Sequence, residues 1–300
     1  MIKRGALLTL FLATIPAQAT DYKHQVRQIF NTEPLNEKYI SVYGKWAGVV
    51  TQKNDGLHMQ FPDGLKKPES LGVLLKQFIH GDFEITLTYE TKTTNPPKSG
   101  YGAGVVVYVM INDGKGTFAA ISCRTLTSGK IEFNTSRGWF PNGKLSQKLE
   151  PTQAKSREGR MQLIREGTTV KYLVQEPGDK SFRLLRLEKD FGSAPVKLCK
   201  IAANRGFSNE PLYTIFRDVT IRADTLSPEL MSVTKDQESE ELAPLPDIET
   251  SVAHNERRSH VPFLLTICAI VIIVVVLLVG WLWVRRRQGE DEDEDEDDSD

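Results

Sequence analysis

Residues 160–178 read RMQLIREGTTVKYLVQEPG, and this stretch decides the expected fold. Polar and apolar side chains alternate over residues 160–163 and again over residues 169–172, within two expected strands, 160–165 and 169–175, that flank the tripeptide 166–168. Its central residue, Gly167, can supply the positive φ that a tight turn between two strands needs. The stretch therefore predicts a β-hairpin.

Runs with the same period of two extend on both sides of this hairpin. Residues 81–90 (GDFEITLTYE) place apolar side chains at every second position, which indicates a strand with one buried and one solvated face. Residues 104–111 (GVVVYVMI) are apolar on both faces, as in a central strand that is covered on both sides. Residues 117–125 and 130–136 follow after turn residues, and we expect them to continue as an antiparallel meander.

The whole region between residues 31 and 224 lacks a long amphipathic helix. We expect a short helical lead-in over residues 22–30, then about ten strands in one sandwich. The closing strand, in residues 213–224, is expected to turn Ile215, Val219 and Ile221 toward the core.

The order of these strands resembles the concanavalin A-like lectin/glucanase superfamily. The residues that carry the resemblance are Gly81, Asp82, Phe83, Glu84, Arg160, Leu163, Arg165, Gly167, Val170, Phe216, Asp218, Val219 and Ile221. The chain is most similar to secreted or membrane-anchored domains of unknown function from planctomycete bacteria, and the 3-keto-disaccharide hydrolase domains are more distant relatives. The resemblance covers about residues 40–224. It implies an all-β, concanavalin A-like jelly-roll sandwich, a fold that hosts lectins, glycosidases and structural modules alike.

The first residues have the pattern of a secretion signal. Lys3 and Arg4 precede an apolar run that ends in the small-residue site 17–19 (Ala-Gln-Ala). We expect residues 1–19 to be a cleaved signal peptide, with an uncleaved anchor as the alternative. The sandwich would then occupy residues 20–224.

The C-terminal part has the pattern of a membrane anchor. Residues 261–284 carry no charge over 24 positions, which predicts one C-terminal transmembrane helix. Residues 225–260 are acidic and contain prolines, so we expect a disordered stalk. Residues 285–300 form a basic anchor followed by an acidic tail. Together with the signal, this predicts a single-pass membrane protein with its N-terminal domain outside the cytoplasm and its tail inside.

Charge and cysteine content exclude some classes of function. The net charge is −1, and lysine and arginine are dispersed without the basic and aromatic clusters of nucleic-acid binding proteins, so nucleic acid is not an expected partner. Cys268 lies in the predicted membrane helix, which leaves Cys123 and Cys199 as the only possible disulfide. Two separate buried thiols are the alternative. The five histidines are scattered singly, so we expect no metal and no cofactor.

The carboxylates do not form the pattern of a sandwich glycosidase. Enzymes of the laminarinase type resemble one another in an E-x-D-x-x-E strand, which this chain lacks. Glu84 and Glu90 lie about 20 Å apart along one extended strand, whereas a retaining pair lies about 5 Å apart. We therefore expect ordinary solvated carboxylates and no catalytic residue. A catalytic role for Glu84, with a partner from another strand, is the alternative.

The loop of residues 137–143 carries two adjacent aromatic residues, Trp139 and Phe140. An exposed tryptophan offers a flat face to a sugar ring or to a partner protein, and Arg124 and Glu84 are its candidate polar companions. A loop tucked over the core is the alternative. The expected function is a membrane-anchored binding module that recognises extracellular glycan or a cell-envelope protein of a bacterium. The rival is a sugar-active hydrolase or lyase of the keto-disaccharide hydrolase-like type.

Overall fold

Strands make up nearly all of the secondary structure in the computed structural model, which describes residues 21–31, 33–43, 49–64 and 70–228. The elements are β1 (His24–Ile29), β2 (Ile40–Tyr43), β3 (Val50–Lys53), β4 (Gly56–Phe61), β5 (Ser70–Leu75), β6 (Phe78–Thr91), β7 (Ala103–Ile111), β8 (Phe118–Thr125), β9 (Ile131–Trp139), the 3₁₀ turn η1 (Pro141–Gly143), β10 (Ser146–Gln153), β11 (Glu158–Glu166), β12 (Thr169–Gln175), β13 (Arg183–Glu188), β14 (Val196–Asn204) and β15 (Leu212–Ser227). They belong to one structural unit of the chain, residues 1–246.

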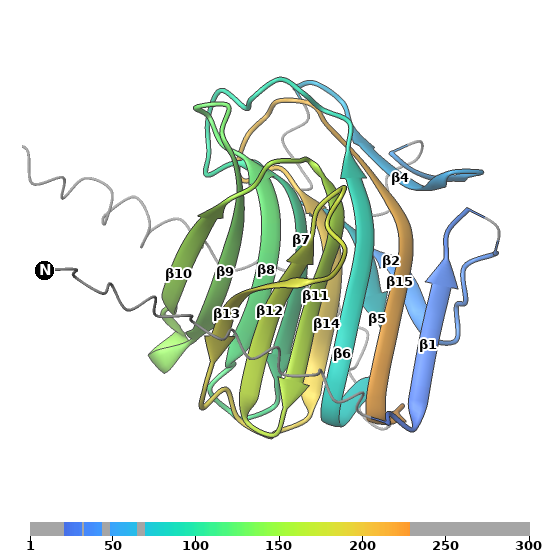
Figure 1. The fold of residues 1–300 in the computed structure, drawn as a ribbon, viewed down its shortest axis with the longest axis vertical. Helices are drawn as coiled ribbons and strands as arrows, with labels where there is room; N and C mark the ends of the chain where they lie inside the picture. Colours follow the sequence, from blue (N-terminus) through green and yellow to red (C-terminus); the bar gives the residue numbers. More distant parts are fainter. Residues whose placement is uncertain (1–20, 32, 44–48, 65–69, 229–300) are drawn as a thin grey trace, which may run out of the picture. The chain divides into compact units, whose positions relative to one another are not determined.

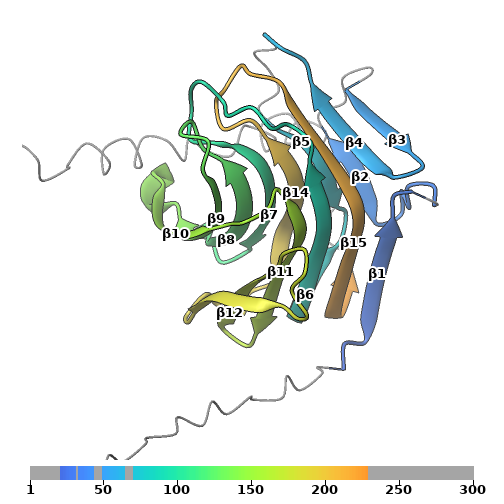
Figure 2. The same ribbon diagram turned by 45° about the horizontal axis from the view of Figure 1, so that its top comes forward.

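The strands form two antiparallel layers (Figures 1 and 2). In the layer that we call the β7 sheet, the order is β10-β9-β8-β7-β14-β5-β2. In the layer that we call the β6 sheet, the order is β13-β12-β11-β6-β15, with β1 and β4 beside β15 and β3 beyond β4. One residue pair, Val196 with Ile79, joins β14 to β6 and links the layers. The result is the all-β sandwich that the sequence predicts.

The two inner faces enclose one hydrophobic core. The four apolar side chains of residues 83–89 in β6 are at most 1% exposed, and Val105, Val107 and Val109 of β7 belong to the same cluster. On the other face of β7, Val106 and Tyr108 are buried in a second cluster. Both predictions for these strands are confirmed, the half-buried β6 and the central β7 covered on both sides.

The hairpin and the meander are also confirmed. β11 and β12 pair from Arg160 with Gln175 to Glu166 with Thr169, and Gly167 has φ +58° in the turn. Strands β7 to β10 pair in sequence order, so they form the predicted meander. The sandwich extends slightly beyond the predicted boundary at residue 224, because β15 continues to Ser227.

The expected helical lead-in is wrong. Residues 24–29 form strand β1, which pairs with residues 218–223 of β15. Val26, Gln28 and Phe30 are buried at every second position, which is the period of a strand. The polar Gln28 hid this pattern, and its side chain is satisfied locally, accepting a hydrogen bond from the Asn36 amide at 2.8 Å.

The expected core position of Ile215 is also wrong. Ile215 is fully buried, but it does not belong to the main core cluster with Val219 and Ile221. A β-bulge between Phe216 and Asp218 shifts the alternation by one residue, so the side chains before and after it face opposite ways.

The predicted signal peptide (1–19), membrane helix (261–284) and tail (285–300), and nearly all of the stalk, lie outside the described residues. Within the described ranges, no helix is long and apolar enough to cross a membrane.

Cys123 and Cys199 are free and buried. Cys123 of β8 lies opposite Val105, whereas Cys199 of β14 lies opposite Val109, so the two thiols are on non-adjacent strands and offset along them. Burial raises the pKa of both thiols to about 12, which keeps them protonated at neutral pH.

Candidate ligand-binding face

The outer side of the β7 sheet differs from an ordinary solvated strand surface because it carries a cluster of buried apolar and aromatic side chains. We call it the tyrosine face, and its central residues are Tyr43 (β2), Ser70 and Leu74 (β5), Lys200 and Ala202 (β14), Val106 and Tyr108 (β7), Phe118, Ala120 and Arg124 (β8), and Glu132 and Asn134 (β9). The face exists because residues 104–111 are apolar at both odd and even positions.

Strand register brings Lys200 to the middle of this face. Lys200 of β14 pairs with Tyr108 of β7 on one side and with Leu74 of β5 on the other. In the next row, Tyr43 pairs with Gly72, which in turn pairs with Ala202. Since these two small residues leave space above the sheet, the Tyr43 ring packs there, with the Lys200 Nζ 4.7 Å from its centre.

Lys200 is a buried cation with little compensation. Its side chain is 8% exposed, and its Nζ donates one hydrogen bond, to the Ser70 hydroxyl at 3.0 Å. Among the described residues, no carboxylate forms an ion pair with it. Burial lowers the pKa of Lys200 to about 8, so the ammonium form still predominates at neutral pH.

The two tyrosine hydroxyls are further donors that lack acceptors. Tyr108 is 1% exposed, and within the described part of the chain its hydroxyl makes no hydrogen bond. The Tyr43 hydroxyl lies near Ser70 without a hydrogen bond of ordinary geometry. Burial raises the pKa of both tyrosines well above the usual value, so both hydroxyls remain protonated donors.

An aromatic row continues from Tyr108. The rings of Tyr108 and Phe118 are stacked with their centres 5.2 Å apart, and Phe118 is followed by Phe140 at 5.8 Å. Gly138 makes this row possible, because a Cβ at that position would lie 2.5 Å from the Phe118 ring. The two aromatic residues of the predicted loop therefore differ in their surroundings. Phe140 packs on Phe118, whereas Trp139 is 37% exposed.

A second polar group lies at the other end of the face. Arg124 forms an ion pair with Glu132 at 3.3 Å, and its guanidinium carbon lies 5.2 Å from the centre of the Tyr101 ring. Asn134 donates to the same carboxylate at 3.4 Å. The buried Arg124 Nε and Asn134 Oδ1 have no hydrogen-bond partner among the described residues.

The structure does not bring the three sequence-predicted site residues together. Arg124 lies on the tyrosine face. Glu84 lies on the outer side of the β6 sheet, paired with Arg222 at 3.1 Å. Trp139 ends β9, and its ring lies 6.0 Å from the guanidinium carbon of Arg137, a residue that contacts Glu188 of the β6 sheet.

Sequence reasoning missed Lys200, Tyr108 and Tyr43. The available signal was a single lysine in the otherwise apolar run of residues 198–203. That pattern suggests a solvated position. Lys200 is buried because Tyr43, a residue of a strand that is distant in the sequence, lies over it. The pairing of β2 with β5, which positions Tyr43, is not visible in the sequence.

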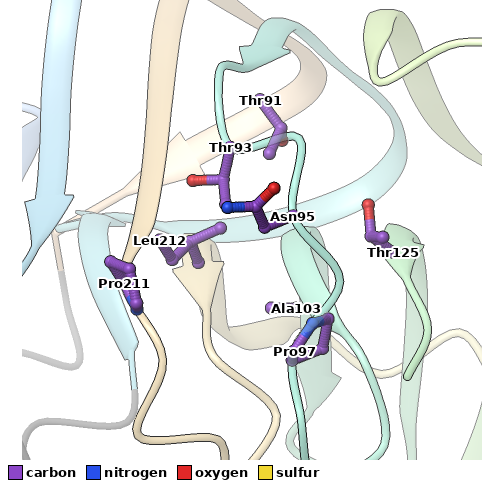
Figure 3. Close-up of a pocket in the computed structure, with 8 residues that line it drawn as sticks. All are labelled: Thr91, Thr93, Asn95, Pro97, Ala103, Thr125, Pro211 and Leu212. Carbon is purple, nitrogen blue, oxygen red and sulfur yellow. The ribbon is translucent and has the colours of Figure 1, made fainter. Parts of the chain in front are cut away.

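A small pocket lies between the loop after β6, the end of β8 and the start of β15 (Figure 3). Its lining residues are Thr91, Thr93, Asn95, Pro97, Ala103, Thr125, Pro211 and Leu212. It has room for about one water molecule, which is far too little for a sugar ring.

The outer side of the β6 sheet carries a separate cluster of ionisable groups. The two ring nitrogens of His58 lie 2.6 Å from the Asp55 carboxylate and 2.6 Å from the Tyr213 hydroxyl. The hydrogen bond with His58 lowers the pKa of Asp55. Every member has a partner, so we interpret the cluster as structural. Within the described ranges, no group of histidine, cysteine and carboxylate side chains could hold a metal ion.

Comparisons with solved structures return sandwich proteins at low identity. The CBM2 module of the Dit protein of Lactobacillus casei BL23 phage J-1 is 10% identical, with a TM-score of 0.47 over 65% of this chain and 93% of that one. Peanut lectin with a 9-residue peptide is 14% identical, with a TM-score of 0.45 over 68% of this chain and 98% of that one. The apo Crh5 transglycosylase is 13% identical, with a TM-score of 0.43 over 67% of this chain and 85% of that one.

No curated protein matches the chain. A family model matches residues 10–257, which include the whole described sandwich. The chain belongs to the family described as "Protein of unknown function (DUF1583) C domain".

Proposed function

We propose that the sandwich is a non-enzymatic glycan-binding module and that the tyrosine face binds the glycan. The observation that carries the proposal is a group of incompletely satisfied buried donors beside an aromatic row, namely the Tyr108 and Tyr43 hydroxyls, which make no hydrogen bond among the described residues, and Lys200, whose ammonium makes one. An unsatisfied buried donor is costly, and an acceptor supplied by a ligand is one way to satisfy it. Sugar hydroxyls supply acceptors, and the apolar side of a sugar ring packs on aromatic side chains.

The chemistry of the face favours binding over hydrolysis. Glycoside hydrolysis generally requires two carboxyl groups on either side of the scissile bond. Among the described strands of the β7 sheet, the tyrosine face carries one carboxylate, Glu132, which is already paired with Arg124. The rival hydrolase or lyase function therefore lacks its second carboxylate on this face.

The sequence patterns at the two ends of the chain extend the proposal. The signal-like residues 1–19 and the apolar residues 261–284 support a module that is displayed outside the cytoplasm on a single membrane helix. A cell-envelope glycan would be within reach of such a module.

A glycan array probed with the full chain in detergent micelles tests the proposal. We expect binding to at least one glycan, and we expect Tyr108→Phe to weaken it about 3- to 10-fold, the effect of one neutral hydrogen bond. The matched control is Tyr172→Phe, because the Tyr172 hydroxyl lies in the core and already donates to the Ser136 carbonyl at 2.9 Å. The control should leave glycan affinity unchanged. No binding to any glycan, or equal effects of the two variants on affinity, would overturn the proposal.

A further inference from the structure

We infer that the glycan carries an anionic group, a carboxylate or a sulfate, and that Lys200 binds it. This inference rests on the proposed glycan-binding function. It names the class of sugar, which the aromatic row and the hydroxyls alone do not specify.

Two other buried cations, Arg165 and Arg186, are satisfied differently from Lys200. Arg165 is fully buried and donates to the Ala194 carbonyl at 2.6 Å and to the Gly81 carbonyl. Arg186, which is 6% exposed, pairs with the carboxylates of Glu188 and Glu150. Both arginines are compensated by carbonyl or carboxylate oxygens, whereas Lys200 has one hydroxyl and one ring. A buried charge that lacks a partner is strongly unfavourable.

Apart from the Ser70 hydroxyl, the groups around the Lys200 ammonium are donors rather than acceptors. Lys200 uses one of its three donors, and the neighbouring Tyr108 hydroxyl offers another donor with no acceptor. The carboxylate of Glu132 lies on β9, separated from β14 by β7 and β8, and Arg124 neutralises it. The centre of the face therefore has donors and a positive charge with no competing carboxylate among the described residues. An anionic oxygen group would accept from Lys200 and Tyr108 together.

The test compares matched ligands on the full chain in detergent micelles by titration calorimetry. The carboxylate probe is tetragalacturonate, and its fully methyl-esterified form is the neutral probe of nearly the same shape. A sulfated galactose tetrasaccharide is the third probe, which separates sulfate from carboxylate as the source of the anion. We expect one of the two anionic probes to bind at least 10-fold more tightly than the methyl ester.

The variants are Lys200→Met, which removes the charge at similar volume, and Lys200→Gln, which keeps a donor for Ser70. Both should weaken binding of the anionic probe about 10- to 100-fold, the range for a hydrogen bond to a charged group. Lys197→Met is the control, since Lys197 lies on the same strand and is exposed, and it should bind as the wild type does.

Unchanged affinity in both Lys200 variants, no binding of either anionic probe, or equal binding of the ester and the acid would overturn the inference. Failure of this kind is distinct from failure of the proposed function. If neutral glycans bind the wild type and Tyr108→Phe weakens them, the glycan-binding proposal stands without an anionic group. If no glycan binds, both fail.

Discussion

The outer sides of the two sheets differ in how their polar groups are satisfied. On the β6 sheet, charges occur in pairs at the surface, such as Glu84 with Arg222 and Lys171 with Glu166. On the β7 sheet, apolar and aromatic residues are buried, and donors such as the Tyr108 hydroxyl have no acceptor in the described residues. Paired surface charges are satisfied within the protein, whereas the buried Tyr108 hydroxyl is not satisfied by the described residues, which is why the proposed ligand is placed there. We therefore place the proposed binding site on the β7 sheet and interpret the outer side of the β6 sheet as a solvated surface.

The largest expected difference between the two outer faces is in the free energy of unfolding that is lost when a side chain is truncated. Phe118→Ala should lower the free energy of unfolding by about 3–5 kcal/mol, because Phe118 is 1% exposed and stacks on two rings. Thr88→Ala, on the outer side of the β6 sheet, should change it by less than about 0.5 kcal/mol. Urea unfolding of both variants measures these changes. Equal losses of unfolding free energy in the two variants would show that the outer faces of the two sheets do not differ in packing.

The next effect is the dependence of stability on pH that Lys200 imposes. Its pKa in the folded protein, about 8, is below its ordinary 10.5, so the unfolded chain binds more protons between these pH values. The contribution of Lys200 to stability therefore rises with pH across this window. Relative to Lys200→Met, the wild type should gain about 3 kcal/mol between pH 8 and pH 10.5, and below pH 8 Lys200→Met should be the more stable protein.

The groups that face Lys200 do not obscure this effect. Tyr43 from β2 and Tyr108 from β7 have raised pKa values in the folded protein, so their ionisation in the unfolded chain lowers stability near pH 10, but it does so in the wild type and in Lys200→Met alike and cancels in the difference. Ser70 from β5 does not titrate. Urea unfolding of both proteins at several pH values measures the difference. A difference that is constant with pH would show that Lys200 is not a buried, uncompensated cation.

A smaller change in the free energy of unfolding is expected when either of two buried tyrosines is replaced by phenylalanine. Tyr108→Phe should leave the free energy of unfolding unchanged or raise it slightly, because the lost hydroxyl has no partner among the described residues. Tyr172→Phe should lower it by about 1 kcal/mol, since it breaks the hydrogen bond to Ser136. A clear destabilisation by Tyr108→Phe would mean that its hydroxyl is satisfied within the protein, which would weaken the case for a ligand.

The smallest expected effect is that of Glu84→Gln. Glu84 pairs with a half-exposed Arg222, and such surface pairs contribute about 0–1 kcal/mol. Stability should change by less than about 0.5 kcal/mol, and glycan affinity should not change. A large loss of glycan affinity in this variant, measured by calorimetry on the same glycan, would show that the glycan binds on the outer side of the β6 sheet.

The sequence predicted the strands whose pattern is regular and local. The β6 strand, the β11–β12 hairpin and the central β7 strand were all visible as periods of two or as continuous apolar runs. Strand β1 was missed because the buried Gln28 interrupts the apolar period, and Ile215 was misplaced because a bulge leaves no mark in the pattern.

The candidate site was harder to predict than the fold. Of the residues proposed from the sequence, Arg124 alone lies on the tyrosine face, and a ligand-binding role for Arg124, Trp139 and Glu84 stays a prediction. Lys200 becomes notable only when Tyr43 and Ser70 are seen to cover it, and that contact depends on the pairing of distant strands. The signal peptide, the membrane helix and the planctomycete resemblance also stay predictions.

The most direct test of the central claim is a crystal structure of the protein with the glycan that binds most tightly on the array. We expect the glycan on the tyrosine face, with its oxygens within hydrogen-bond distance of Lys200 Nζ and the Tyr108 hydroxyl, and with the side chains that bury these two groups displaced to admit it. A glycan bound at Trp139, or on the outer side of the β6 sheet near Glu84, would contradict it.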